Sequence, residues 1–313
     1  MQAKIPVLLL LFTLSTSAQV LQWARQFGTN RAEYALAVAV SGDAVYVSGE
    51  TAGAFEGATN AGGNDCFVRK FDSSGNHLWT RQFGVAGNDS GLGLAADASG
   101  VYVVGQTQGV IAGASAGSGD AFVRKYDPDG NELWTRQFGT SGDDSAMSVA
   151  VHTTGVYVSG MVTGALPGQV TPALNQADAF LRKYDAAGNE VWTRQFGTVN
   201  AERGRGVAAD ASSIYITGET GGALVSAAAG TDSYVRKYDA SGTVIWTRQI
   251  TSQGNQADIA YGVAVHSSGV YVTGDTVAAF TGQTKVGGLY DAWVRKFDLN
   301  GVEHWTRQFG TTD

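Results

Sequence analysis

The sequence predicts an all-β fold of four-stranded antiparallel sheets repeated in tandem, the β-propeller architecture. One observation is a short phrase, Trp-x-Arg-Gln-Phe-Gly or a close variant, which begins at six tryptophans: Trp23, Trp79, Trp134, Trp192, Trp246 and Trp305. These tryptophans are 56, 55, 58, 54 and 59 residues apart, and such a period is typical of one supersecondary unit copied along the chain. The other observation is composition, because 43 glycines and only 4 prolines favour many tight turns.

The second copy shows the four expected strands. Residues 92–96 and 101–104 flank a short turn, and the β-branched and aromatic residues of the second segment are typical of strands. A loop rich in Gly, Ala and Ser follows, and 120–127 and 132–138 form the third and fourth strands around a second turn. Small residues occupy the first strand and large ones the fourth. We therefore expect the first strand innermost, at the propeller axis, and the Trp strand outermost.

Counting strands leaves the closure of the ring open. The chain holds five sets of the first three strands but six Trp strands, so 21–28 is surplus or displaces the C-terminal copy. We expect a single domain over 19–313, with five closed blades of about 55 residues and one extra N-terminal outer strand. The alternative is an open arc or part of a larger propeller, completed by another chain or by missing sequence.

The N-terminus predicts export. Lys4 precedes an apolar run over 5–14 that is too short to span a bilayer, and small residues up to Ala18 offer a cleavage site. We therefore expect a signal peptide over 1–18 and a secreted, periplasmic or cell-surface protein. The net charge of −7 disfavours nucleic acid and anionic membranes as partners. A membrane span is not expected.

The fifth copy carries a resemblance to a known family. Gly-Val-Ala-Val-His at 262–266, Val-Tyr-Val-Thr-Gly at 270–274, Asp-Ala-Trp-Val-Arg-Lys-Phe-Asp at 291–298 and Trp-Thr-Arg-Gln-Phe at 305–309 resemble the bacterial SBBP-type β-propeller repeat. They are more distantly similar to NHL repeats. The resemblance covers 19–313 and implies an exported bacterial protein, in a family whose activity is mostly unassigned. The family name implies seven blades, whereas this chain has five full copies.

Basic residues repeat in the third and fourth strands. In one register Arg124 lies opposite Arg136, a repulsive pair. A shift of two residues sets Arg124 against Trp134 and Phe122 against Arg136, in cation–π contacts. We favour this second register. A basic ligand-binding belt is the alternative role for these arginines.

Other repeated or isolated polar residues are expected to be structural. An aspartate begins each third strand, where short carboxylates accept N–H groups of the preceding loop: Asp65, Asp120, Asp178, Asp232 and Asp291. Cys66 stands where other copies have Ala or Ser, so we expect a small buried side chain. The four histidines occupy turns and lack metal-ligand spacing.

A binding site is expected on one face of the propeller. The longer connections open on that face, and variable loops on a rigid scaffold favour ligand binding: 51–64, 107–119, 162–177, 220–231 and 276–290. The least generic loops contain the candidate ligand residues Asn175, Phe280, Lys285 and Tyr290.

An acidic residue also enters each first strand from the loop face: Glu33, Asp89, Asp144, Glu202 and Asp258. In a closed ring these carboxylates form a candidate cation or ligand ring, with Ca²⁺ as the possible cofactor. The alternative is that each caps its own loop or pairs with an arginine such as Arg31, Arg203 or Arg205.

Three functions remain open from the sequence. The leading hypothesis is an exported, non-catalytic propeller that binds a protein or glycan through its variable loops. The second is a metal-assisted hydrolase or lyase that uses the acidic channel mouth. The third is a structural module of a cell-surface protein. The fold does not decide among them, because propellers host many functions.

Overall fold

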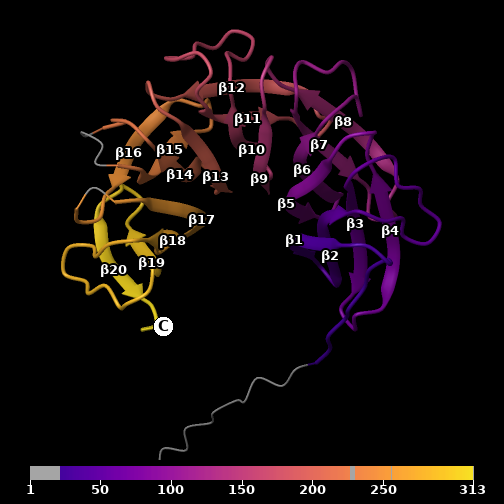
Figure 1. Ribbon diagram of the computed structural model, residues 1–313, viewed down its shortest axis with the longest axis horizontal. Coiled ribbons are helices and arrows are strands. Elements are labelled where there is room, and N and C mark those ends of the chain that lie inside the picture. Colours follow the sequence, from indigo (N-terminus) through magenta and orange to yellow (C-terminus); the bar gives the residue numbers. More distant parts are fainter. Residues whose placement is uncertain (1–21, 226–229, 255, 313) are drawn as a thin grey trace, which may run out of the picture.

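A computed structural model describes residues 22–225, 230–254 and 256–312; the expected signal peptide over 1–18 lies outside them. Every regular element in the described chain is a β-strand, and twenty strands form five separate four-stranded antiparallel sheets. The sheets stand side by side around a central axis (Figure 1). The expected all-β fold of four-stranded blades, five in number, is confirmed.

Each blade consists of four consecutive strands. Blade 1 contains β1 (Glu33–Ser41), β2 (Ala44–Thr51), β3 (Asp65–Asp72) and β4 (His77–Phe83). Blade 2 contains β5 (Asp89–Asp97), β6 (Gly100–Thr107), β7 (Asp120–Tyr126) and β8 (Glu132–Phe138). Blade 3 contains β9 (Ser145–His152), β10 (Gly155–Val162), β11 (Asp178–Tyr184) and β12 (Glu190–Phe196). Blade 4 contains β13 (Glu202–Ala209), β14 (Ser213–Thr220), β15 (Asp232–Asp239) and β16 (Val244–Ile250). Blade 5 contains β17 (Asp258–His266), β18 (Gly269–Thr276), β19 (Asp291–Phe297) and β20 (Glu303–Phe309).

The predicted strand order is confirmed. The first strands β1, β5, β9, β13 and β17 contact one another around the axis, and the Trp strand lies at the outer edge of each sheet. Close packing explains the small residues of the inner strands. A Cβ on Gly93 of β5 would lie 2.9 Å from Val104 Cγ2 and 3.0 Å from the Met147 carbonyl oxygen of the next blade.

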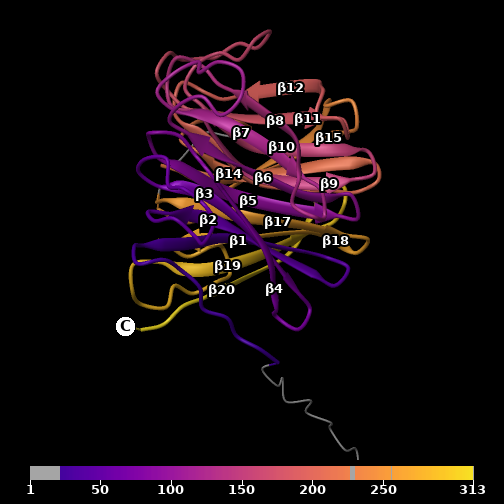
Figure 2. The ribbon, with the colours of Figure 1, turned by 90° about the vertical axis from the view of Figure 1, so that its right-hand side faces the viewer.

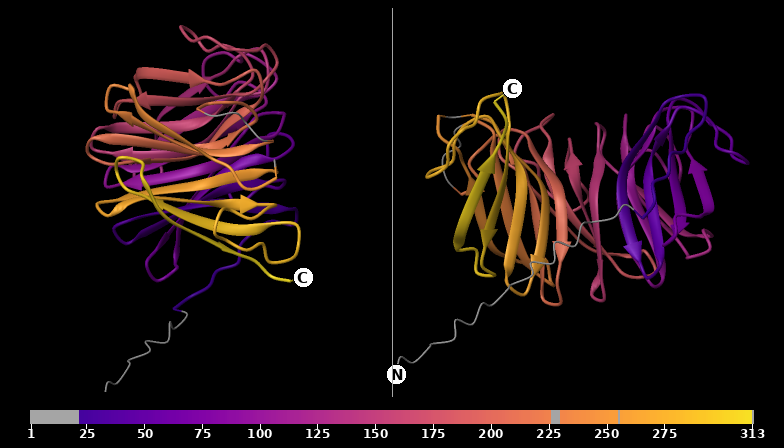
Figure 3. Two further views of the ribbon diagram at one scale, coloured as in Figure 1. Left: turned by 90° about the vertical axis from the view of Figure 1, so that its left-hand side faces the viewer. Right: turned by 90° about the horizontal axis from the view of Figure 1, so that it is seen from below.

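The hydrophobic core lies between neighbouring sheets. One cluster joins Tyr102 and Val123 of blade 2 to Val158 and Phe180 of blade 3, all of them buried. Both faces of an interior blade are therefore covered by its neighbours, and the turns and loops lie at the two ends of the strands (Figures 2 and 3). Tight hairpins form one of these surfaces, and the longer connections form the other, which we call the loop face.

The Trp phrase joins each of the first four blades to the next one. Trp134 of blade 2 donates its indole N–H to the Ala186 carbonyl oxygen at 3.2 Å, and Arg136 Nε donates to the Gly188 carbonyl oxygen at 2.7 Å. Both acceptors lie in the β11–β12 hairpin of blade 3. Gly188 has φ +77° and lies against the Trp134 ring, where a Cβ would come within 2.6 Å of the indole. Only glycine meets both conditions.

The favoured register of the basic residues is wrong. Lys125 pairs with Trp134 and Arg124 pairs with Thr135, so Arg124 faces neither Trp134 nor Arg136 across the hairpin. A bulge after Lys125 sets this register. The Arg124 guanidinium instead lies 3.9 Å from the ring centroid of Phe83, on the preceding blade. The two expected cation–π contacts are therefore absent, and Arg124 makes its cation–π contact across the blade junction instead.

The expected closed ring is also wrong, since the five blades form an open arc with β1–β4 and β17–β20 at its ends (Figure 1). Val38 in β1 is 65% exposed, whereas its counterparts Val149 and Val207 in blades 3 and 4 are 7% and 8% exposed. The side chains of β1 therefore lack the neighbour that covers the inner strands of interior blades. This is the open-arc alternative of the sequence analysis.

Candidate functional site

The loop face is built on a repeated glutamine–aspartate pair. In blade 2, Gln137 Nε2 donates to Asp120 Oδ2 at 2.6 Å and to the Gly109 carbonyl oxygen at 2.7 Å. Its Oε1 accepts the Ile111 N–H at 2.9 Å, and Asp120 accepts the Ala116 N–H at 3.0 Å. The same side-chain pair recurs in the other blades: Gln82 and Asp65, Gln195 and Asp178, Gln249 and Asp232, Gln308 and Asp291. A constant scaffold thus holds loops of different sequence.

The predicted role of the leading aspartates is confirmed in three blades. Asp65, Asp120 and Asp291 accept N–H groups of their own loops, from Ala61, Ala116 and Val286 respectively. The glutamine partner was missed by sequence reasoning. Its constant place in the Trp phrase was the available signal, because a residue repeated in every copy has a repeated contact.

The five acidic candidates do not converge on one point. Asp89, Asp144, Glu202 and Asp258 are buried at separate junctions between blades, and Glu33 lies at the open face of blade 1. At the junction of blades 2 and 3, a Cβ on Gly139 would lie 2.5 Å from Asp120 Oδ1 and 2.6 Å from Asp144 Oδ2. Each junction therefore pairs two carboxylates. Within the described ranges, no group of three or more His, Cys, Asp or Glu side chains is arranged to hold a metal ion.

The junction carboxylates accept hydrogen bonds from backbone N–H groups of the loops, and their pKa values are raised. Asp144 Oδ2 accepts the Thr140 N–H, and its Oδ1 accepts the Thr163 N–H at 3.0 Å. Burial nevertheless raises the pKa of Asp144 to about 6, against these hydrogen bonds and with help from the Asp120 charge. Burial also raises the pKa of Asp89, Glu202 and Asp258. These four carboxylates therefore cap their own loops, which was the alternative to a cation-binding ring in the sequence analysis.

The candidate ligand residues in the loops have different environments. Asn175 is exposed and has φ +62°, and Tyr290 is also exposed. Phe280 is fully buried against Trp293, with the Arg295 guanidinium 4.7 Å from its ring centroid, so it belongs to the blade 5 core. Lys285 is held by Asp291 at 3.2 Å and by the Gly287 carbonyl oxygen at 2.7 Å. Of the four, Asn175 and Tyr290 face solvent.

Large aliphatic side chains project from the same loops. Val170, Leu174 and Leu289 are 81%, 80% and 79% exposed, among the most exposed apolar residues described, and Val110 and Val225 are exposed in two further loops. Sequence reasoning missed them. Single aliphatic residues inside loops rich in Gly and Ala give a weak signal, because a loop residue packs inward as readily as it faces solvent.

A second non-repeated cluster lies on the inner strands of blades 4 and 5. Arg203 and Arg205 both bind the buried Glu219, with Arg205 Nε 2.5 Å from Glu219 Oε2. The Arg205 guanidinium also lies 5.3 Å from the ring centroid of Tyr261, whose hydroxyl donates to Asp275. The available signal was the appearance of arginines at positions where other blades have small or apolar residues. The arginines pair with Glu219 rather than with Glu202.

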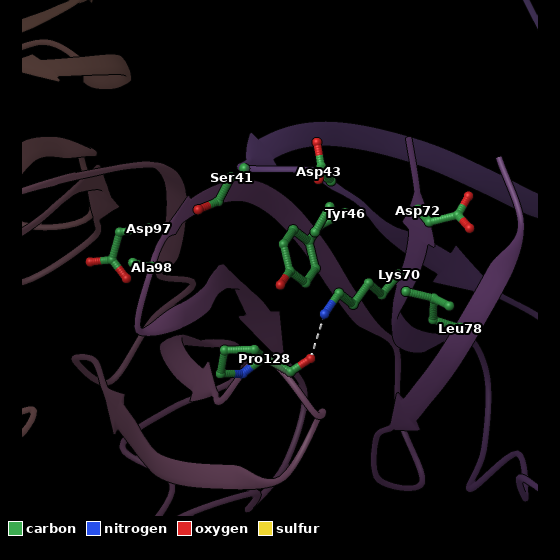
Figure 4. Close-up of a pocket in the computed structure, with 11 residues that line it drawn as sticks. Ser41, Asp43, Tyr46, Lys70, Asp72, Leu78, Asp97, Ala98 and Pro128 are labelled. Atoms are coloured by element: carbon green, nitrogen blue, oxygen red, sulfur yellow. Dashed lines mark hydrogen bonds between the residues drawn. The ribbon is translucent and has the colours of Figure 1, made fainter. Parts of the chain in front are cut away.

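The hollow shown in Figure 4 lies on the hairpin side of the junction between blades 1 and 2 and has a volume of about 390 Å³. Tyr46, Lys70 and Leu78 of blade 1 line it, with Pro128 of blade 2. Lys70 Nζ donates to the Pro128 carbonyl oxygen at 2.7 Å. Lys237 makes the corresponding bond between blades 4 and 5. The polar group of this hollow is therefore part of the blade junction.

Comparisons with known proteins give partial matches. No family model matches the chain. The chain is 31% identical over 200 residues to "Regulatory protein FlaEY" of Caulobacter vibrioides, and the match covers 57% of this chain and 21% of that protein. It is 29% identical over 171 residues to "Uncharacterized WD repeat-containing protein L264" of Acanthamoeba polyphaga mimivirus, with 45% and 12% covered. The chain thus spans less than a quarter of either relative's length.

Solved structures with similar folds have low sequence identity. The Neurospora crassa Pan2 WD40 domain matches with a TM-score of 0.38 and 12% identity, over 85% of this chain and 76% of that one. A subtype N10 neuraminidase-like protein of A/little yellow-shouldered bat/Guatemala/060/2010 matches with a TM-score of 0.49 and 8% identity, over 89% and 83%. In the described part of the chain, no helix is long and apolar enough to cross a membrane. The evidence for the propeller-like architecture is the five four-stranded sheets of the chain itself.

Proposed function

We propose that this chain is an exported, non-catalytic binding scaffold of the SBBP propeller type, and that its loop face binds another protein. The observation that carries the proposal is the exposure of Val170, Leu174 and Leu289 on loops that the repeated glutamine–aspartate pairs hold in place. Exposed apolar side chains on a rigid framework favour protein association.

The chemistry of the loops favours a protein over a glycan. Sugar rings are bound largely by flat aromatic faces with hydrogen-bonding groups nearby, and Tyr290 is the one strongly exposed large aromatic residue in the described loops. The other exposed large hydrophobic side chains in these loops are aliphatic. Aliphatic side chains stabilise a complex mainly because their apolar surface is removed from water. A protein partner with a surface of matching shape can bury them in this way.

The bonding of the charged groups supports a non-catalytic role. Asp89, Asp144, Glu202 and Asp258 each accept a backbone N–H of the loop that precedes them. Arg136 and Lys70 bind carbonyl oxygens of the neighbouring blade. These groups therefore hold blades and loops in place.

The test is a parallel binding screen of the purified chain against secreted proteins of its host and against a glycan array. Any ligand found is then measured against a loop variant, Val170→Ser with Leu174→Ser. A matched control, Leu133→Ser with Val191→Ser, changes residues of the outer strands that are also about half exposed or more. We expect the loop variant to lose binding at least about tenfold, with the control unchanged.

Three outcomes contradict parts of the proposal. A protein ligand that the loop variant binds as well as the unchanged chain overturns the loop face as the site. A glycan ligand whose binding requires Tyr290 overturns the choice of a protein partner. Export is tested separately by N-terminal sequencing of the chain purified from its host, where we expect a start near Gln19, and an intact Met1 contradicts export.

A further inference from the structure

The arginine in the middle of each third strand has a carboxylate partner in three blades. In blade 2, Arg124 Nη1 lies 3.4 Å from Glu132 Oε2. The same ion pair recurs in blades 3 and 5, between Arg182 and Glu190 and between Arg295 and Glu303. Each glutamate lies two residues before the tryptophan of its fourth strand and is partly exposed. At the outer rim of these blades, the repeat therefore supplies its own carboxylate to the arginine.

Blade 1 keeps the arginine, Arg69, but has His77 in place of the glutamate. In the described chain, no hydrogen bond or ion pair is made by the Arg69 side chain, and its Nε is buried. Blade 4 also lacks the glutamate, but there Arg236 Nε donates to Thr247 Oγ1 at 2.8 Å. The counterpart Thr80 instead forms a 2.8 Å hydrogen bond with His77 Nε2. Arg69 thus differs from its counterparts in lacking both partners.

Aromatic rings surround the Arg69 guanidinium. Its central carbon lies 4.5 Å from the ring centroid of Phe27, 5.0 Å from that of Phe55 and 5.7 Å from that of Phe71. Burial here lowers the pKa of Arg69. A guanidinium still stays charged at ordinary pH, and a buried charge is costly unless a group of opposite charge pairs with it. The partner that Arg69 lacks is therefore an anion.

A hollow of about 310 Å³ opens beside this guanidinium. Its lining residues are Gly28, Phe55, Glu56, Arg69, His77 and Thr80. The volume is at the lower end of the range for small-molecule sites. The hollow therefore has room for a small acid or for one acidic side chain.

The same hollow exists at an interior junction of the arc. Between blades 2 and 3 its volume is about 520 Å³, and Gly139, Arg182 and Glu190 line it at the positions of Gly28, Arg69 and His77. There the repeat's own carboxylate lies beside the arginine. The hollow of blade 1, which we call the rim hollow, is thus a regular feature of the repeat from which the carboxylate has been removed.

We propose that the rim hollow of blade 1 binds a single carboxylate, which lies between Arg69 and His77 in the place that the Glu190 carboxylate occupies in blade 3. Arginine and carboxylate match in shape and in hydrogen-bonding groups. Either a free monocarboxylic acid or an acidic side chain of a bound protein supplies this group. The inference concerns the outer rim and does not rest on the proposed loop-face function.

Glu56 and His77 determine which carboxylates bind and at which pH. Glu56 is exposed and lines the same hollow, so its charge disfavours a ligand with a second negative charge. Burial and the Arg69 charge lower the pKa of His77, and the Glu56 charge opposes them. A bound carboxylate offsets the Arg69 charge and favours protonated His77. Affinity should therefore rise as the pH falls from about 8 to about 6.

The test is a titration of the labelled chain with sodium propionate, at an ionic strength held constant with sodium chloride. Nuclear magnetic resonance follows the Arg69 Nε–H and His77 ring signals. We expect both to shift in a saturable manner, with succinate binding more weakly. Glu56→Gln should strengthen binding of succinate more than binding of propionate.

Two variants exchange residues between the blades. His77→Glu supplies the missing carboxylate, so propionate binding should weaken by at least about tenfold. The variant should melt no lower than the unchanged chain, which shows that it is folded. Glu190→His removes the carboxylate from blade 3, and the Arg182 Nε–H signal should then respond to propionate.

The proposal is overturned if Arg69 and His77 do not respond to propionate, or if the His77→Glu variant binds it as well as the unchanged chain. It is also overturned if chloride alone produces the same shifts, because the hollow then takes any anion. A capped tripeptide, acetyl-Gly-Glu-Gly-amide, separates the two sources of the carboxylate. Binding at least about tenfold tighter than that of propionate assigns the carboxylate to a protein, and equal or weaker binding assigns it to a free acid.

Discussion

The junctions between blades and the two ends of the arc are built from the same repeated residues but differ in what those residues touch. At a junction, Trp134 and Arg136 bind the next hairpin and Asp144 is buried beside Asp120. At the ends, Phe309 is exposed and Glu33 lies at an uncovered face. The repeat therefore encodes half an interface on each side of a blade, and a stable junction requires both halves.

Electrostatics follow the same division. Burial raises the pKa of Asp89, Asp144 and Glu202 at the junctions. Burial also acts on Glu33, but the hydrogen bonds from Thr29 and Thr51 outweigh it, and the pKa of Glu33 is lowered. A repeated carboxylate thus gains or loses affinity for protons according to whether a neighbouring blade covers it.

The largest effect that sharpens this comparison is expected from Gly188→Val. The new side chain meets the Trp134 ring and must adopt φ +77°, so we expect a loss of about 3 kcal/mol or more in the free energy of unfolding. Gly57→Ala is the control, because Gly57 also has φ +77° but a Cβ there has open space. Its loss should stay near 1–2 kcal/mol. Urea denaturation measures both, and equal losses would show that the junction contact contributes nothing beyond backbone strain.

A smaller effect is expected from pH. Burial raises the pKa of Asp144 in the folded chain to about 6, from an ordinary value of 3.8. Between these two pH values, Asp144 is protonated in the folded chain and ionised in the unfolded chain. The free energy of unfolding should therefore be greater at pH 5 than at pH 7.5, by about 1 kcal/mol from Asp144 alone. Asp127 on the hairpin side has a lowered pKa because Asn131 donates hydrogen bonds to its carboxylate. Its contribution to the free energy of unfolding is therefore lost only as the pH falls below its ordinary range. Asp144→Asn should flatten the dependence, and an unchanged slope contradicts the assignment.

The smallest effect on stability is expected on the loop face. Val170→Ser with Leu174→Ser should change the free energy of unfolding by less than about 0.5 kcal/mol per site, since both side chains are almost fully exposed. Thermal denaturation checks this. A large loss would place these side chains in packing contacts and remove them as binding residues.

Sequence reasoning predicted the repeated parts of the fold and failed where contacts cross between blades. The strand order followed from side-chain size, because the space near the axis admits only residues such as Gly93. The register around Arg124 was wrong, since period two within one hairpin gives no information on the bulge after Lys125 or on Phe83 of the neighbouring blade. The closed ring was wrong because strand counts do not specify the angle between blades.

The candidate site was predicted less completely for a related reason. The loop positions followed from strand direction, but whether a side chain such as Phe280 packs inward or Leu289 faces solvent depends on contacts within an irregular loop. The five acidic residues were expected around one channel. Four of them instead lie beside the aspartate of the preceding blade, which for Asp144 is Asp120, about 24 residues earlier in the sequence, and Glu33 lies at an uncovered face.

The most direct test of the account compares Trp134→Ala with Trp305→Ala by chemical denaturation. Both tryptophans begin the same phrase, but Trp134 is docked on the hairpin of blade 3 and the described chain offers no hairpin to Trp305. We predict a loss of about 3–5 kcal/mol for Trp134→Ala and clearly less than half of that for Trp305→Ala. Equal losses would contradict the claim that docking on the next blade, rather than packing within its own sheet, is what the Trp phrase contributes.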